Sequence, residues 1–254
     1  PTYTVHELTS PAGYVIPLDI TFAIDRFGNI TSDNAEVVDG VVLIKHQKTQ
    51  VPVLVIESGT MNPLAGAIMQ VIDQNNTVVR EWSTLADDPE TVDIDESIKV
   101  IEGLSTVREY ILRQIAATNG FLLSSDITFT IDESGKITSS GSMTDDGVLL
   151  VENSLTKVAV SVIDVASGII LPGAIVQLFN DQGAFVESWE SQVDDPDTED
   201  VDESLHFIEG LTSNVTYQLR QFIAPAGYLI AEPIDFVIDE TGNINSTGTQ
   251  TEES

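Results

Sequence analysis

The stretch YTVHELTSPAGY, from Tyr3 to Tyr14, returns twice along the chain. Its second copy is YILRQIAATNGF, from Tyr110 to Phe121, and its third is YQLRQFIAPAGY, from Tyr217 to Tyr228. Each copy begins 107 residues after the one before it, and the match needs no gap. A repeat that keeps so long a spacing indicates tandem copies of a whole domain. The 254 residues therefore hold two full units and about 40 residues of a third.

The residues within one unit favour β-strands. Apolar runs that alternate or are β-branched occur in the first unit and return in the second, at 51–56, 67–72, 110–115 and 126–131. Turn residues such as Asn75-Asn76 separate them, and no stretch shows the apolar stripe of a three-turn helix. We therefore predict an all-β chain of two-sheet sandwiches, each with about seven short strands.

The repeat also predicts the domain boundaries. Residues 41–147 and 148–254 are expected to form one sandwich each, and residues 1–40 match only the C-terminal third of a unit. The polar runs 138–146 and 245–254 are the expected linkers. Three strands without the rest of their sandwich leave open edges and half a core. Either this chain is a window cut from a longer array, or residues 1–40 complete a neighbouring molecule by donor-strand exchange.

Composition excludes several classes of function. The chain has 10 Lys and Arg against 41 Asp and Glu, a net charge of −31, which disfavours nucleic acid and anionic membrane surfaces as partners. There is no cysteine, so disulfides cannot stabilise the fold. No apolar run approaches the roughly 20 residues of a membrane helix. The hydrophobic fraction of 42% is enough for a packed core.

The ordered motifs of the unit resemble a known family. Ile208-Glu209-Gly210-Leu211 leads to the Tyr217 strand, the Ala224–Tyr228 loop and the Phe236–Asp239 strand, and Pro63–Ala67 reads P-L-A-G-A. This order is similar to the collagen-adhesin B-type domain of Gram-positive surface proteins and pilins, also called Cna-B, SpaA-like or prealbumin-like. The resemblance implies tandem transthyretin-like (Ig-like) β-sandwich domains that serve as stalk or pilin modules.

The family is also known for an internal covalent bond, but this chain does not have the residues for that bond at the matching positions. Many members of the family carry an internal isopeptide bond between a Lys and an Asn or Asp, promoted by a buried Glu. Here the Lys positions fall on Val55 and Val162, and the Glu positions fall on Gln114 and Gln221. Valine offers no amine, and an amide cannot pass a proton as a carboxylic acid does. We therefore predict no intradomain isopeptide bond. Glu7 keeps the acid in the partial unit, and Lys45, Lys48 and Lys157 do not occupy matching positions.

An acidic stretch precedes each I-E-G-L motif, at residues 87–97 and 194–204. Clustered carboxylates are ligands that Ca²⁺ prefers, and Asp93, Asp95, Asp200 and Asp202 are the candidate ligands. The alternative is a solvated acidic loop, because the ligand order of a helix–loop–helix calcium site is missing. Trp82 and Trp189 precede these loops and are expected to anchor the core, with a sugar-stacking platform as the alternative.

These observations point to a structural protein rather than an enzyme. No catalytic residues are predicted, because the repeated units share no Ser–His–Asp set, phosphate-binding loop or zinc ligands. We expect a stalk, pilus or filament module of a bacterial surface protein, extracellular or attached to the cell wall. No cofactor is expected apart from the possible Ca²⁺, and the expected partners are neighbouring repeats or other copies. The alternative is an adhesive or calcium-binding module that recognises a host protein or glycan.

Overall fold

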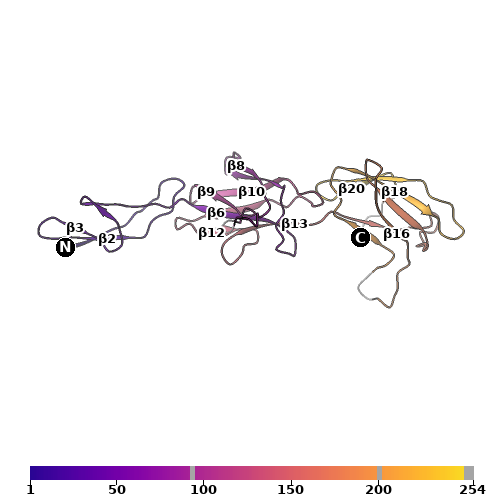
Figure 1. Ribbon diagram of the computed structural model, residues 1–254, viewed down its shortest axis with the longest axis horizontal. Coiled ribbons are helices and arrows are strands. Elements are labelled where there is room, and N and C mark those ends of the chain that lie inside the picture. The colour runs from indigo at the N-terminus through magenta and orange to yellow at the C-terminus, as the bar shows by residue number, and fades with distance from the viewer. Residues whose placement is uncertain (92–94, 199–201, 249–254) are drawn as a thin grey trace. The chain divides into compact units, whose positions relative to one another are not determined.

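The computed structural model describes residues 1–91, 95–198 and 202–248 (Figure 1). These residues form twenty strands and no helix, which confirms the predicted all-β class. None of the described segments is therefore a helix that could span a membrane. The chain divides into two compact units, residues 1–116 with 124–152, and residues 117–123 with 153–254. The backbone thus passes from one unit to the other at three points.

The first sandwich pairs a five-stranded sheet with a three-stranded sheet. The larger sheet has the order β12-β11-β10-β7-β8 and contains β7 Ile68–Asp73, β8 Val78–Ser83, β10 Glu109–Ala116, β11 Ile127–Ile131 and β12 Ile137–Ser139. The smaller sheet has the order β13-β6-β9 and contains β6 Gln50–Glu57, β9 Lys99–Glu102 and β13 Leu149–Asn153. The first and last strands of this sandwich, β6 and β13, are therefore hydrogen-bonded neighbours.

Alternate residues of both sheets form the core of the first sandwich. On β11, Ile127, Phe129 and Ile131 are buried, while the threonines between them are exposed. Leu149 and Val151 of β13 add two fully enclosed side chains to the same cluster. Other buried members come from β6, β7 and β10: Val51, Val53, Val55, Met69, Val71, Tyr110 and Leu112. The opposite face of the small sheet carries a second cluster of Leu54, Ile56 and Leu150.

The second sandwich repeats the large sheet of the first and, among the described residues, two strands of its small sheet. Its five-stranded sheet has the order β16-β15-β18-β19-β20, with β15 Ile175–Phe179, β16 Phe185–Glu190, β18 Thr216–Ile223, β19 Ile234–Ile238 and β20 Ile244–Ser246. The small sheet has β14 Lys157–Val160 and β17 His206–Glu209 as its strands among the described residues. Its buried core consists of Val158, Leu178, Ile208, Leu211, Tyr217, Phe236 and Ile238.

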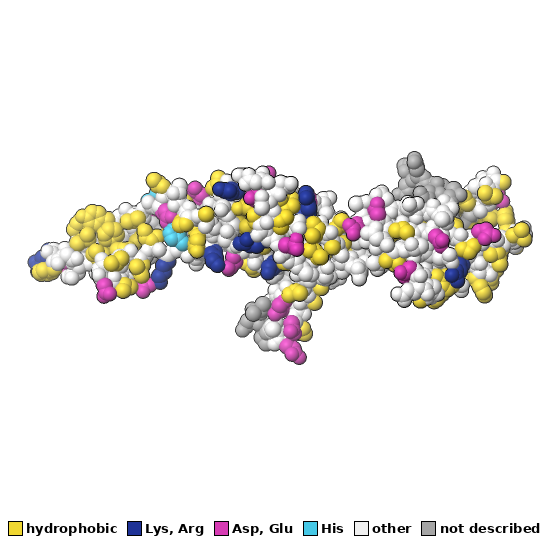
Figure 2. All heavy atoms as spheres, turned by 90° about the horizontal axis from the view of Figure 1, so that it is seen from above, with side chains coloured by type: hydrophobic (Ala, Val, Ile, Leu, Met, Phe, Trp, Pro, Cys, Tyr) yellow, Lys and Arg dark blue, Asp and Glu magenta, His cyan; other side chains and the backbone are white. Residues whose placement is uncertain are grey.

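The N-terminal residues form a small open sheet. Its order is β1-β2-β3, with β1 Thr2–Val5, β2 Ile20–Ile24 and β3 Ile30–Thr31, and a hairpin of β4 Val37–Val38 and β5 Val41–Val42 follows. Tyr3 stacks on Phe22 as Tyr110 stacks on Phe129, but Tyr3 is 47% exposed where Tyr110 is 4% exposed. Figure 2 shows hydrophobic side chains gathered at this end of the chain. Strand β1 is exposed along its length, whereas Ile20 of β2 is buried and the rest of β2 is half-buried, so this sheet covers its apolar face only in part.

The structure moves the predicted boundary between the two full units. Strand β13 belongs to the small sheet of the first sandwich, so the second sandwich begins at about residue 153 rather than at residue 148. Residues 138 and 139 lie in β12, and residues 140–146 lie between β12 and β13 within the first unit, so the prediction that residues 138–146 form a linker is wrong. The structure also groups residues 1–40 with the first sandwich in one compact unit.

An aspartate closes the same hairpin turn in every repeat. Asp25, Asp132 and Asp239 each accept two backbone N–H groups, from residues two and four positions further along. Side-chain hydrogen bonds from Asn29, Ser134 and Asn243 respectively are the main cause that holds the pKa of each carboxyl below its ordinary value. The charged form therefore favours the folded turn.

We predict that these turns lose stabilisation in acid. A carboxyl whose pKa is lower in the folded than in the unfolded state stabilises the fold above its unfolded value, near 3.9. That contribution is lost as the pH falls through the folded value. The difference in unfolding free energy between the native chain and Asp132→Ala should therefore be largest above about pH 5 and shrink towards about pH 2. Urea titrations across this range measure it, and a difference independent of pH would contradict the expectation.

Candidate functional site

The two valines that replace the isopeptide lysine of the family lie in or beside strands of the two sandwiches. Val55 is on β6, 1% exposed, in the first core. Val162 follows β14 and lines a cavity of the second sandwich. Lys45, Lys48 and Lys157 instead form ion pairs, with Glu36, Glu102 and Glu209 respectively. The absence of an isopeptide bond stays a prediction.

The two glutamines at the acid positions share a structural role. Gln114 Oε1 accepts a hydrogen bond from Ser124 N at 2.8 Å, and Gln221 Oε1 accepts one from Ala231 N at 2.7 Å. Each bond ties strand β10 or β18 to the residue ten positions later, beyond the loop that follows the strand. In the partial unit, Glu7 Oε2 lies 3.2 Å from His46 Nε2. The glutamine side chains therefore hold the loop ends in place, a role that requires no proton transfer.

The acidic loops use several of their carboxylates internally. Asp95 accepts hydrogen bonds from Ser97, and Asp202 accepts them from Ser204. Glu203 accepts bonds from Asp195 N and the Thr198 hydroxyl, which lower the pKa of its carboxyl. Asp93 and Asp200 lie outside the described residues. Within the described part of the chain, no three His, Asp or Glu side chains are grouped to hold a metal ion. Calcium binding stays a prediction, which melting curves with Ca²⁺ and with EDTA would test.

A loop from each of the first two copies of the repeated stretch packs against the sandwich that follows it in sequence. Gly13 O accepts a hydrogen bond from Thr49 N at 3.0 Å, and Gly103 N donates to Thr49 O at 3.1 Å. The Thr49 hydroxyl donates to Leu104 O at 2.6 Å, and Thr49 is fully buried. Ile16 N completes the contact with a 2.8 Å bond to Glu133 O. We call this arrangement the docked loop.

The docked loop recurs 107 residues later with the same bonds. Gly120 O accepts from Thr156 N at 2.9 Å, Gly210 N donates to Thr156 O at 3.0 Å, and the Thr156 hydroxyl donates to Leu211 O at 2.6 Å. Leu123 N donates to Glu240 O at 2.9 Å. This second loop therefore belongs to the second compact unit, although the strands on either side of it belong to the first sandwich.

Removing one hydroxyl should weaken the second docked loop. Thr156→Val keeps the shape of the side chain but leaves Leu211 O without its donor in a buried site. We predict a loss of about 1–3 kcal/mol in the unfolding free energy of the second sandwich. The control is Thr130→Val on β11, where the threonine is exposed and the change should stay within about 0.5 kcal/mol. Equal effects at the two positions would contradict the role assigned to Thr156.

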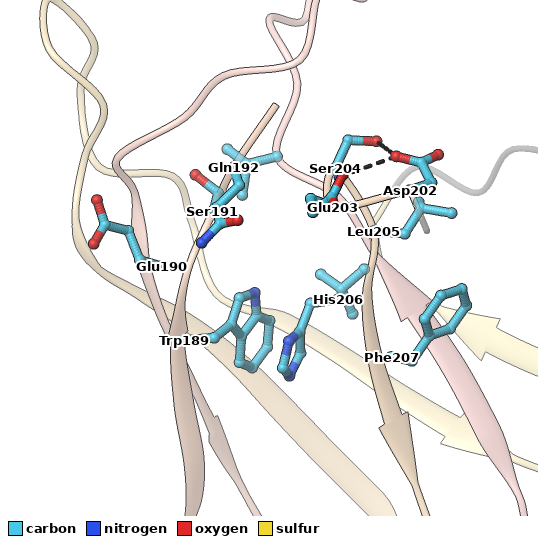
Figure 3. Close-up of a pocket in the computed structure, with 12 residues that line it drawn as sticks. Trp189, Glu190, Ser191, Gln192, Asp202, Glu203, Ser204, Leu205, His206 and Phe207 are labelled. Carbon is cyan, nitrogen blue, oxygen red and sulfur yellow. Dashed lines mark hydrogen bonds between the residues drawn. The ribbon is translucent and has the colours of Figure 1, made fainter. Parts of the chain in front are cut away.

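A cavity of about 370 Å³ opens in the second sandwich beside β14 (Figure 3). It is lined by Val160, Val162, Trp189, Leu205 and Phe207, with Glu190, Asp202 and Glu203 among its polar residues. The rings of Trp189 and His206 lie face to face, with centroids 4.0 Å apart and planes at 11°. Trp189 is half-buried and packs against the second core, and Trp82 packs likewise against the first. Both tryptophans thus contact a core, as expected of anchors.

The cavity corresponds to a filled part of the first sandwich. One period earlier, its residues Val160, Val162 and Trp189 become Val53, Val55 and Trp82. Those three pack in one cluster with Leu149 and Val151 of β13. Among the described residues of the second sandwich, β14 has β17 as its single neighbour. The positions one period after Leu149 and Val151 are 256 and 258, which lie outside the 254 residues of this sequence. The sequence pattern did not predict the cavity.

Comparison with known proteins supports the fold. Residues 50–145 match the family model SpaA, described as a prealbumin-like fold domain, which confirms the resemblance indicated by the motifs. The first sandwich is therefore a prealbumin-like domain. The second repeats its five-stranded sheet order, with β15, β16, β18, β19 and β20 in place of β7, β8, β10, β11 and β12. A search of curated proteins gave no match.

A search of solved structures matched the chain to a TIE protein, a pilus adhesin and a shaft pilin. The Bacillus anthracis TIE protein is 18% identical, with a TM-score of 0.44, over 95% of this chain and 40% of its own. The open conformation of the pilus adhesin SpaC from Lactobacillus rhamnosus GG is 14% identical, with a TM-score of 0.37, over 93% and 30%. The D295N mutant of the shaft pilin spaA from the same organism is 14% identical, with a TM-score of 0.30, over 76% and 94%. This chain thus spans less than half of the first two.

Proposed function

We propose that the chain is a non-enzymatic structural module of a bacterial cell-surface protein, located outside the cell in a stalk, pilus or similar filament. Its partners are neighbouring repeats of the same chain or other copies in the filament. The observation that carries the proposal is the docked loop, which recurs with the same hydrogen bonds at Thr49 and Thr156. The resemblance of the motifs to surface and pilin domains of Gram-positive bacteria supports this setting.

The docked loop gives the repeat a mechanical role. Each loop leaves and re-enters one sandwich while it hydrogen-bonds to residues of the next repeat. The backbone therefore passes between the two compact units three times, where a simple tandem array needs one linker. A module of this kind transmits load and holds whatever it carries away from the cell wall.

The stalk function can be tested by measuring how far the repeats hold a tag from the cell wall. One, two or four copies would be inserted between a cell-wall anchor and a peptide tag on a Gram-positive surface. The height of the tag above the wall should rise in proportion to the number of copies. A Gly/Ser linker with the same number of residues is the control, since the reach of a flexible coil grows with about the square root of its length. Square-root growth for the repeats as well would refute the stalk function.

A further inference from the structure

The backbone bonds of the two docked loops are the same, so they cannot distinguish one loop from the other. In the first loop, Val15 N donates to Gln47 O at 2.9 Å, and in the second, Leu122 N donates to Ser154 O at 2.8 Å. Both bonds join groups that every non-proline residue carries. Recognition between a particular loop and a particular sandwich must therefore come from side chains.

A histidine and a glutamate hold the first docked loop. His46 Nδ1 lies 3.4 Å from Val15 O, and Nδ1 is the donor because a carbonyl oxygen only accepts. His46 Nε2 lies 3.2 Å from Glu7 Oε2, and the two side chains are only 21% and 19% exposed. The imidazolium ring has an N–H group on each nitrogen, so it can donate to both oxygens at once. His46 therefore links the loop to the strand end that carries Glu7.

The second docked loop has amides where the first has this ionisable pair. Asn153 and Gln114 lie one period after His46 and Glu7. Asn153 Nδ2 donates at 2.6 Å to Leu122 O, the carbonyl that corresponds to the one His46 contacts. Asn153 is 1% exposed, so its amide provides a donor in a buried place without burying a charge.

The end of the loop differs in a way that fits these side chains. In the second loop, Ser124 N donates to Gln114 Oε1 at 2.8 Å. The corresponding residue of the first loop is Pro17, which has no N–H group and cannot donate to Glu7. The donor that faces Glu7 is His46 instead. Each loop thus has three side chains that satisfy its own hydrogen bonds and not those of the other loop.

We propose that the docked loops carry matched recognition sets, which determine which loop docks on which sandwich. The first set is Glu7, Pro17 and His46, and the second is Gln114, Ser124 and Asn153. In each set two residues belong to the loop and its stem, and the third precedes the strand β6 or β14 on which the loop docks. A mixed set leaves a partly buried polar group without its partner, which weakens docking. The proposal rests on the docked loop of the proposed function and states what makes the contact between successive repeats selective.

Hydrogen exchange of the Thr49 amide tests the first set, because Thr49 N donates to Gly13 O in the docked loop. His46→Asn alone leaves Glu7 without a donor, and it should raise the exchange rate of this amide by about tenfold or more. The same substitution combined with Glu7→Gln and Pro17→Ser installs the second set. The triple variant should therefore return the rate to within about threefold of that of the unsubstituted chain, since the three changes are coupled rather than additive.

The second docked loop provides an internal control and a reciprocal test. The Thr156 amide, which donates to Gly120 O, should exchange at an unchanged rate in all of these variants. Asn153→His alone should raise the rate of the Thr156 amide by about tenfold, because the ring then lacks a carboxylate partner. Addition of Gln114→Glu and Ser124→Pro should reverse most of this increase.

The amides of β7 and β10 should stay protected in the variants of the first set, which separates undocking from unfolding. A His46→Asn chain with an unchanged Thr49 rate would refute the matched sets. So would a triple variant that exchanges as fast as His46→Asn alone. Either result would leave the docked loop and the tag-height experiment unaffected. A Thr49 amide that is unprotected in the unsubstituted chain would instead contradict the docked loop, and with it the observation that carries the proposed function.

Discussion

Phe129→Ala should lower the unfolding free energy of the first sandwich by about 3–5 kcal/mol. Phe129 is 1% exposed and stacks on Tyr110 with ring centroids 5.5 Å apart. Its removal leaves a cavity between two sheets whose backbones are fixed by strand pairing, so the site cannot collapse easily. Urea unfolding followed by Trp82 in a Trp189→Phe chain measures the change.

The repeat provides a matched control for this substitution. Phe22 occupies the same position in the N-terminal open sheet and stacks on Tyr3 in the same way, but Tyr3 is 47% exposed. Phe22→Ala should therefore cost less than half as much as Phe129→Ala when the same transition is followed. Phe236, 3% exposed in the second sandwich, should resemble Phe129 when Trp189 is the reporter. Equal effects of Phe22→Ala and Phe129→Ala would mean that the core is wrongly assigned.

Gly120→Ala should detach the second docked loop and destabilise the second sandwich by roughly 2–5 kcal/mol. Gly120 has a φ of +87°, and a Cβ there would lie 2.8 Å from Gly210 O, a backbone atom that cannot move aside. The cost combines the strain of alanine at positive φ, roughly 1–2 kcal/mol, with the clash. Trp189 fluorescence in a Trp82→Phe chain follows the transition, and hydrogen exchange of the Thr156 amide reports whether the loop is docked.

Substitution of Gly227 is the control that separates the steric clash expected at Gly120 from the strain of a positive φ. It occupies the same turn one period later with a φ of +88°, but a Cβ there would meet nothing within 4 Å. Gly227→Ala should therefore cost only the strain of the positive φ, and the Thr156 amide should stay protected. If Gly120→Ala and Gly227→Ala destabilised the chain equally, the docked loop would contribute nothing beyond its turn.

The sequence predicted the features that depend on local pattern. Strict alternation on 127–131 and the spacing of the Tyr110 and Tyr217 strands predicted the strands and their buried faces. The glycines at 13, 120 and 227 recur in the repeated loop, and the structure gives each a positive φ, but what they approach could not be predicted. That Gly13 and Gly120 meet Gly103 and Gly210 depends on contacts across about 90 residues of sequence.

The features that sequence could not predict depend on which strands pair. The repeat period fixes the length of a unit but not its starting point, so a boundary at residue 148 matched the pattern as well as one near residue 153. Only the pairing of β13 with β6 decides between them. The valines at 55 and 162 could be placed on or beside the first strand of each sandwich, because their motif lies close by in the sequence.

Stretching single chains held at their two ends tests most directly the claim that these repeats bear load without an internal covalent crosslink. In the first sandwich β6 and β13 are hydrogen-bonded neighbours, so pulling shears their ladder. The first sandwich should therefore unfold in one step, lengthening the chain by roughly 35 nm for residues 50–153. A first sandwich that stays inextensible, or extends by only a fraction of that length, would contradict the account.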